Sequence, residues 1–121
     1  MIFNILIGNT DDHAKNHALF WDGKFVRLTP AFDICIIPRI GFTAGQAMEV
    51  GEQGKLATIA NALSSSRQFG LSREEAGAMI AEMESLIRAN WRDACDQSEM
   101  PARVADNLWH RAVLSPAIFE N

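Results

Sequence analysis

Three polar residues in the first third of the chain have the types and the order that phosphoryl transfer requires. Asp11 and Asn16 stand five apart in the run GNTDDHAKN at residues 8–16, and a further carboxylate, Asp33, follows in AFDI. A hydroxyl acceptor needs a carboxylate to orient it and take its proton, and nucleotide phosphates need a metal held by an Asn oxygen and a second Asp. We therefore interpret Asp11 as a catalytic base and Asn16 and Asp33 as metal ligands, and we expect all three side chains to face one cleft.

The protein-kinase pattern H-R-D-x-x-x-x-N followed by D-F-G has the same logic. Here Thr10 stands where that pattern has Arg, and Ile34-Cys35 follow Asp33 where it has Phe-Gly. The polar residues therefore keep the kinase order, whereas their immediate neighbours differ from it.

In their residues and order the two motifs, GNTDDHAKN and RLTPAFDI at residues 27–34, closely resemble those of the HipA family of bacterial toxin serine/threonine kinases. The resemblance extends through MEVG at residues 48–51 and the helical tail, nearly the whole chain. It implies the C-terminal, helical part of such a kinase, with Mg²⁺ and ATP as cofactors. It also places Asp11 on the family's catalytic aspartate, and Asn16 and Asp33 on its magnesium ligands.

Neighbouring residues of the first motif leave several roles open. In many protein kinases a Lys two residues after the base contacts the transferred phosphate, and His13 or Lys15 could make that contact with the nucleotide here. Asp12 could assist metal binding, but we expect a solvated or capping role. His13 and His17 have the spacing of a helical zinc site but lack the Glu of H-E-x-x-H, which argues against zinc.

Composition limits the other possibilities. The chain has 121 residues, 48% of them hydrophobic, and a formal net charge of −4, which is typical of one globular domain and argues against direct nucleic-acid binding. Cys35 and Cys95 form no metal or disulfide motif, which favours a reduced, cytoplasmic setting, and we expect Cys35 to be a buried apolar residue. The apolar run before Gly8 is too short to span a membrane.

The motifs must be positioned by a small hairpin and a helical body. Asp22-Gly23 favours a two-residue type I′ turn inside a hairpin over residues 17–28. Ser72 and Glu75 form a capping box at the start of an amphipathic helix. The fold class is therefore α+β, mostly α, with the hairpin carrying the catalytic loop. The remaining expected elements are a helical or buried segment at 1–7, a long loop at 35–55 with a short strand at 46–50, and helices at 56–63, 72–95 and 99–113.

A complete kinase also needs a glycine-rich loop over the phosphates and a strand Lys that pairs with them. The chain contains no G-x-G-x-x-G, and no Lys precedes Asp11. We therefore expect residues 1–121 to form a single HipA-like C-terminal domain whose nucleotide-clamping N-terminal part is absent. The surface where that part would dock should be partly apolar.

Two classes of function follow. The first is the catalytic-loop part of a HipA-like serine/threonine protein kinase of toxin–antitoxin type, inactive alone. The alternative is a non-catalytic interaction module that binds an antitoxin-like partner. A weaker hypothesis is a metal-dependent phosphohydrolase that uses Asp11, Asp12, His13 and Asp33. The expected partners are the missing N-terminal half or a companion chain, a HipB-like antitoxin and a second copy of the chain; nucleic acid and membrane are not expected.

Overall fold

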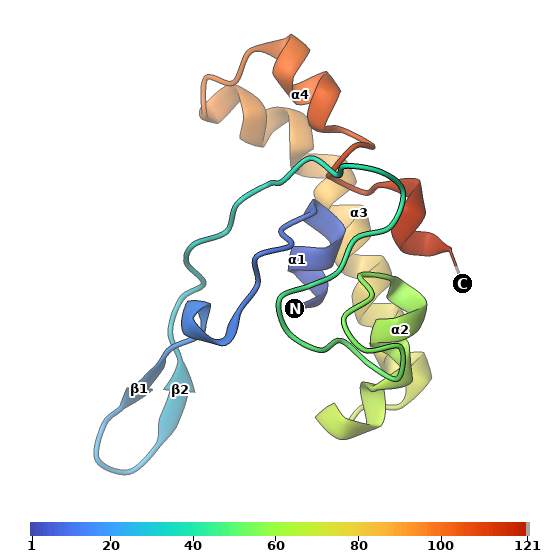
Figure 1. Ribbon diagram of the computed structural model, residues 1–121. Helices are drawn as coiled ribbons and strands as arrows, with labels where there is room; N and C mark the ends of the chain where they lie inside the picture. The colour runs from blue at the N-terminus through green and yellow to red at the C-terminus, as the bar shows by residue number, and fades with distance from the viewer. Residues whose placement is uncertain (121) are drawn as a thin grey trace.

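The structure is a computed structural model that describes residues 1–120. A helical body carries a two-stranded hairpin that stands away from it (Figure 1). The fold is mixed α+β and mostly helical, as the sequence predicts. Its elements are α1 (Ile2–Ile7), η1 (Ala14–Asn16), β1 (Leu19–Trp21), β2 (Val26–Leu28), α2 (Ile59–Ser64), η2 (Ser66–Phe69), α3 (Arg73–Gln97), α4 (Ala102–Leu108) and η3 (Pro116–Phe119), where η denotes a 3₁₀ helix.

The short helix α1 lies at the centre of the core. Its residues Ile5 and Leu6 are fully buried and pack with Val113, Leu114 and Ile118 from the C-terminal segment. Leu114 also donates its backbone N–H to the carbonyl of Leu6 at 2.7 Å. A helix of this length is not stable by itself in water, so its stability comes from this apolar packing. The loop that follows α1 therefore starts from a fixed point.

The long helix α3 is the scaffold on which the other helices pack. Ser72 and Glu75 form the predicted capping box: each side chain accepts a hydrogen bond from the other residue's backbone N–H. The helix buries Ile80 and packs Trp91 against the core. Trp91 also lies against Trp109, with ring centroids 5.8 Å apart. No helix among residues 1–120 is long and apolar enough to cross a membrane.

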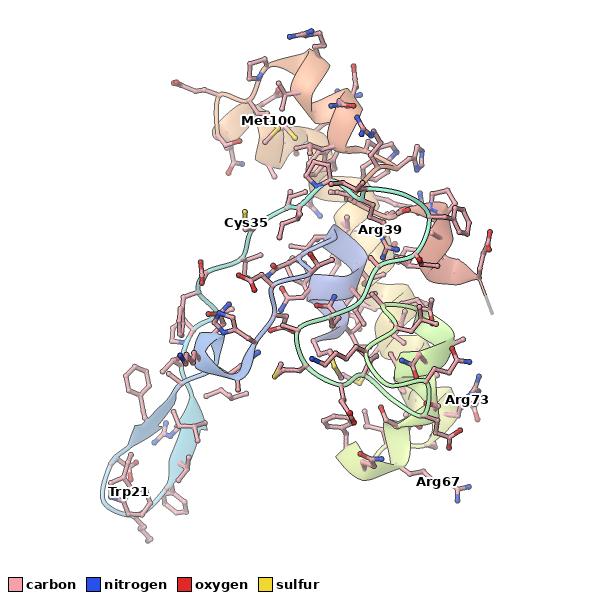
Figure 2. All side chains as sticks on the ribbon, viewed as in Figure 1. Trp21, Cys35, Arg39, Arg67, Arg73 and Met100 are labelled. Carbon is pink, nitrogen blue, oxygen red and sulfur yellow. The ribbon has the colours of Figure 1, made fainter. Side chains whose placement is uncertain are left out.

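The hairpin is confirmed, but the predicted two-residue turn is wrong. Trp21 pairs with Val26, so four residues connect the strands. Within this loop Asp22 Oδ1 accepts the backbone N–H groups of Lys24 and Phe25, at 2.9 and 2.8 Å. Asp therefore shapes the turn by bonding the backbone that follows it. Figure 2 shows Trp21 at the far end of the hairpin, away from the body.

Two other expectations differ from the structure. Residues 46–50 form no strand, and the long loop contributes only isolated bridges such as Gly45 with Leu56. The predicted helix at 99–113 is confined to α4, and His110 has a φ of 65°. The reason is tertiary, because Ala112 and Val113 are drawn into the core beside α1, where their burial outweighs the gain from continuing the helix.

Candidate functional site

Gly8 begins the loop that carries the first motif. It ends α1 in the left-handed region with φ 78°, and its N–H reaches the carbonyls of Asn4 and Ile5. A Cβ at this position would lie 2.9 Å from the backbone oxygen of Ala112. Both the positive φ and the close approach require glycine. The backbone conformation of Gly8 therefore fixes the direction in which the loop leaves α1.

Asn9 holds the next part of the loop. It is buried, and its side chain donates to Asn4 Oδ1 at 3.2 Å, while its backbone N–H donates to the Asn4 carbonyl at 2.8 Å. Asn9 Oδ1 in turn accepts the backbone N–H of Asp11 at 3.3 Å. A buried amide that satisfies both ends in this way ties the Asp11 backbone to α1.

Asp11 combines a held backbone with a free side chain. Its carbonyl accepts the N–H of His13 at 2.9 Å and the side-chain amide of Asn16 at 3.2 Å. Its side chain is exposed, and none of the described hydrogen bonds or ion pairs uses its carboxylate. This arrangement suits a residue that must meet a hydroxyl group from another molecule.

Asn16 and Asp33 line the same cavity, which has a volume of about 180 Å³. The cavity lies between the start of α1, the beginning of the hairpin, and the segment that follows β2. Thr29 closes the base of the hairpin by donating its N–H to the carbonyl of Ala18 at 3.0 Å. The hairpin therefore brings together two residues that are far apart in the sequence. Asp11 does not line this cavity, so only two of the three side chains that we expected in one cleft share it.

Asp33 occupies an unusual backbone conformation, with φ 55°. Asp tolerates the left-handed region better than most residues because its short side chain can bond locally. Four residues later the N–H of Ile37 donates to the carbonyl of Gly8 at 3.3 Å. The segment that carries Asp33 is thus attached to the start of the loop that carries the first motif.

Asp12 differs from the sequence-based expectation, because it is neither solvated nor a cap. It is 1% exposed, and the ring of His17 contacts its Oδ1 through Nε2 at 2.6 Å. Burial opposes ionisation of Asp12. The polar side chain of Asn4, the His17 ring and the amino-terminal charge outweigh burial and lower the pKa of Asp12. The sequence does not show which of the adjacent residues Asp11 and Asp12 is buried, because their burial depends on the path of the loop.

The two candidate nucleotide-binding residues do not reach this cavity. His13 is partly buried, and its Nδ1 has no hydrogen-bond partner among residues 1–120. Lys15 is exposed in η1. Their contact with a nucleotide stays a prediction. Cys35, expected to be buried, is exposed, because the segment after Asp33 runs along the outside of the body (Figure 2).

The residues present suit Mg²⁺ better than a transition metal. Residues 1–120 contain no cluster of three or more His, Cys, Asp or Glu side chains that could hold a metal ion, so the phosphohydrolase hypothesis gains no support. The amide nitrogen of Asn16 is used by the Asp11 carbonyl, which leaves its oxygen for a cation. An amide oxygen and the Asp33 carboxylate are hard donors of the kind that Mg²⁺ takes while keeping several waters.

Comparison with known proteins agrees with the motifs. The family model described as HipA-like C-terminal domain matches residues 1–91. No curated protein and no solved structure matches the chain. The match includes both motifs, the hairpin and most of α3, whereas the resemblance expected for the rest of the helical tail is not covered. Because the match spans most of the chain, the protein belongs to the family of HipA-like C-terminal domains.

Proposed function

We propose that this chain is the catalytic-loop part of a HipA-like serine/threonine protein kinase of toxin–antitoxin type, acting in the cytoplasm with Mg²⁺ and ATP. The observation that supports it best is the shared cavity of Asn16 and Asp33, beside a loop that holds the backbone of Asp11 and leaves its carboxylate free. Family membership alone shows only that the chain is a HipA-like C-terminal domain.

In this proposal each residue has a separate task. Asp11 orients the hydroxyl of a serine or threonine and accepts its proton. Asn16 and Asp33 hold Mg²⁺, which when bound neutralises charge on the phosphates. His13 or Lys15 contacts the transferred phosphate. The hairpin keeps Asn16 and Asp33 together. Asn9 fixes the backbone of Asp11 and so holds the base near them.

The nucleotide clamp must come from outside these residues, from an N-terminal half or a companion chain. Exposed apolar residues support such a partner. Leu19, Phe20, Trp21, Val26 and Leu28 of the hairpin are each more than half exposed. Contiguous apolar surface is typical of interaction sites. A HipB-like antitoxin and a second copy of the chain are further proposed partners.

The test is reconstitution with the N-terminal half of a HipA-like kinase. The 121-residue chain alone should bind Mg-ATP only weakly, because positioning of the triphosphate is missing. The reconstituted kinase should bind Mg-ATP in calorimetry and transfer radiolabelled phosphate to serine or threonine. Asp11→Asn should abolish transfer and leave Mg-ATP binding intact. Asp106→Asn is the matched control, because Asp106 is an exposed carboxylate that pairs with Arg92 on the surface.

The alternative function is a non-catalytic interaction module. The exposed apolar hairpin favours this alternative, because such a surface can bind a partner protein without any catalytic activity. It predicts a stable complex with a partner protein whose affinity does not change with Asp11→Asn, and no phosphate transfer after reconstitution. Transfer that depends on Asp11 would exclude this alternative.

A further inference from the structure

Asp12 has one carboxylate oxygen that the protein leaves without a hydrogen bond. The side chain is 1% exposed, and Oδ1 is engaged by His17. Oδ2 is buried and has no hydrogen-bond partner among residues 1–120. Buried polar atoms in folded proteins are nearly always paired, and exceptions point to a missing water or ion. We therefore expect Oδ2 to bind a water molecule or an ion.

The cavity that Asp12 lines is the one that Asn16 and Asp33 share. Its ionisable lining side chains are Asp12, Asp33 and His17, and the His17 ring is already engaged with Asp12. The α-amino group of Met1 lies 3.6 Å from Asp12 Oδ2, an ion-pair distance longer than a hydrogen bond. A small divalent cation binds carboxylate oxygens directly and would satisfy Oδ2.

The geometry points to Asp12 as a third oxygen anchor for the divalent cation that Asn16 and Asp33 hold, an inference that rests on the proposed function. Asp12 extends the donor set from one carboxylate and one amide to two carboxylates and one amide. Asp12 is itself held by the ring of His17, a polar partner outside the donor set. Second carboxylates and orienting partners of this kind raise metal affinity.

The test uses Mn²⁺ as the probe, with the 121-residue chain and no nucleotide. Free Mn²⁺ is measured by electron paramagnetic resonance for the wild type and for Asp12→Asn, Asp33→Asn and Asp106→Asn. We expect Asp12→Asn to weaken Mn²⁺ binding by about tenfold or more. Asp106→Asn removes the same charge from the surface and should leave the affinity unchanged. His17→Gln removes the ring and keeps the Asp12 carboxylate, so a smaller loss than that of Asp12→Asn indicates direct participation of the carboxylate.

A second measurement needs no variant and remains decisive if Asp12→Asn does not fold. In ¹³C spectra of the wild type, the Asp12 and Asp33 carboxyl carbons should shift with Mg²⁺ and broaden with trace Mn²⁺, whereas the Asp106 carbon should do neither. Wild-type affinity in Asp12→Asn together with loss in Asp33→Asn would overturn the role of Asp12 and leave the proposed function standing. A silent Asp12 carbon would overturn it as well. Failure of the proposed function would appear separately, as absence of phosphate transfer after reconstitution.

Discussion

Replacing Gly8 by alanine tests whether the core fixes the start of the loop that carries Asp11 and Asn16. Gly8 has a φ of 78°, and a Cβ there would lie 2.9 Å from the Ala112 oxygen and 3.0 Å from its Cα. Those atoms belong to backbone that is itself buried beside α1, so they cannot move aside cheaply. Gly70 provides the matched control, because its φ is 71° and a Cβ added there would have no neighbour within 4 Å.

The expected magnitude has two parts. An alanine in the left-handed region costs about 1 kcal/mol relative to glycine, and this part applies to both Gly8→Ala and Gly70→Ala. Overpacking against fixed backbone adds about 1–3 kcal/mol, and this part applies only at Gly8. Gly8→Ala should therefore lower the free energy of unfolding by about 2–4 kcal/mol, a large share of the stability of a typical domain.

Urea unfolding at about 25 °C, followed by tryptophan fluorescence, measures both variants. Trp91 and Trp109 pack at the core and report its loss. The midpoint should fall for both variants with little change in slope, and further for Gly8→Ala. Equal destabilisation would refute the argument, because it would mean that the chain relieves the contact with Ala112 at no cost. Destabilisation of Gly70→Ala alone would refute it more strongly.

Three further outcomes follow from local structure. Gly77→Ala should raise the unfolding free energy by about 0.5–1 kcal/mol in the same assay, because Gly77 lies inside α3 with open space around it; a loss of stability would contradict this. Hydrogen bonds from Ser72 lower the pKa of Glu75, so its stabilising effect is present above the pKa of the unfolded chain and is lost as the pH falls through the lower folded value. Glu75→Gln should therefore lose less stability than the wild type between about pH 5 and pH 3, and parallel pH profiles in thermal unfolding would count against the capping interaction. Trp21→Ala should change stability by no more than about 0.5 kcal/mol because its side chain is 65% exposed, whereas Trp91→Ala should cost about 2 kcal/mol or more in urea unfolding; similar effects at the two positions would mean that the hairpin packs on the body.

Local rules of the sequence were accurate where a few neighbouring residues decide the outcome. The capping box of Ser72 and Glu75 and the hairpin around Asp22 both formed, because their hydrogen bonds join residues that are close in the chain. The exact turn was missed because the Asp22 side chain bonds the loop backbone, which sets a four-residue connection in place of a two-residue turn.

The sequence alone determined the order of Asp11, Asn16 and Asp33, the family resemblance and the mixture of one hairpin with several helices. Only the tertiary structure decided that Asp12 is buried and that Asp11 stays outside the cavity, because both depend on where the loop leaves α1. It also decided the early end of α4. There the C-terminal segment gains more by packing its backbone and apolar side chains against α1 than by continuing a helix, and that gain arises between residues at opposite ends of the chain.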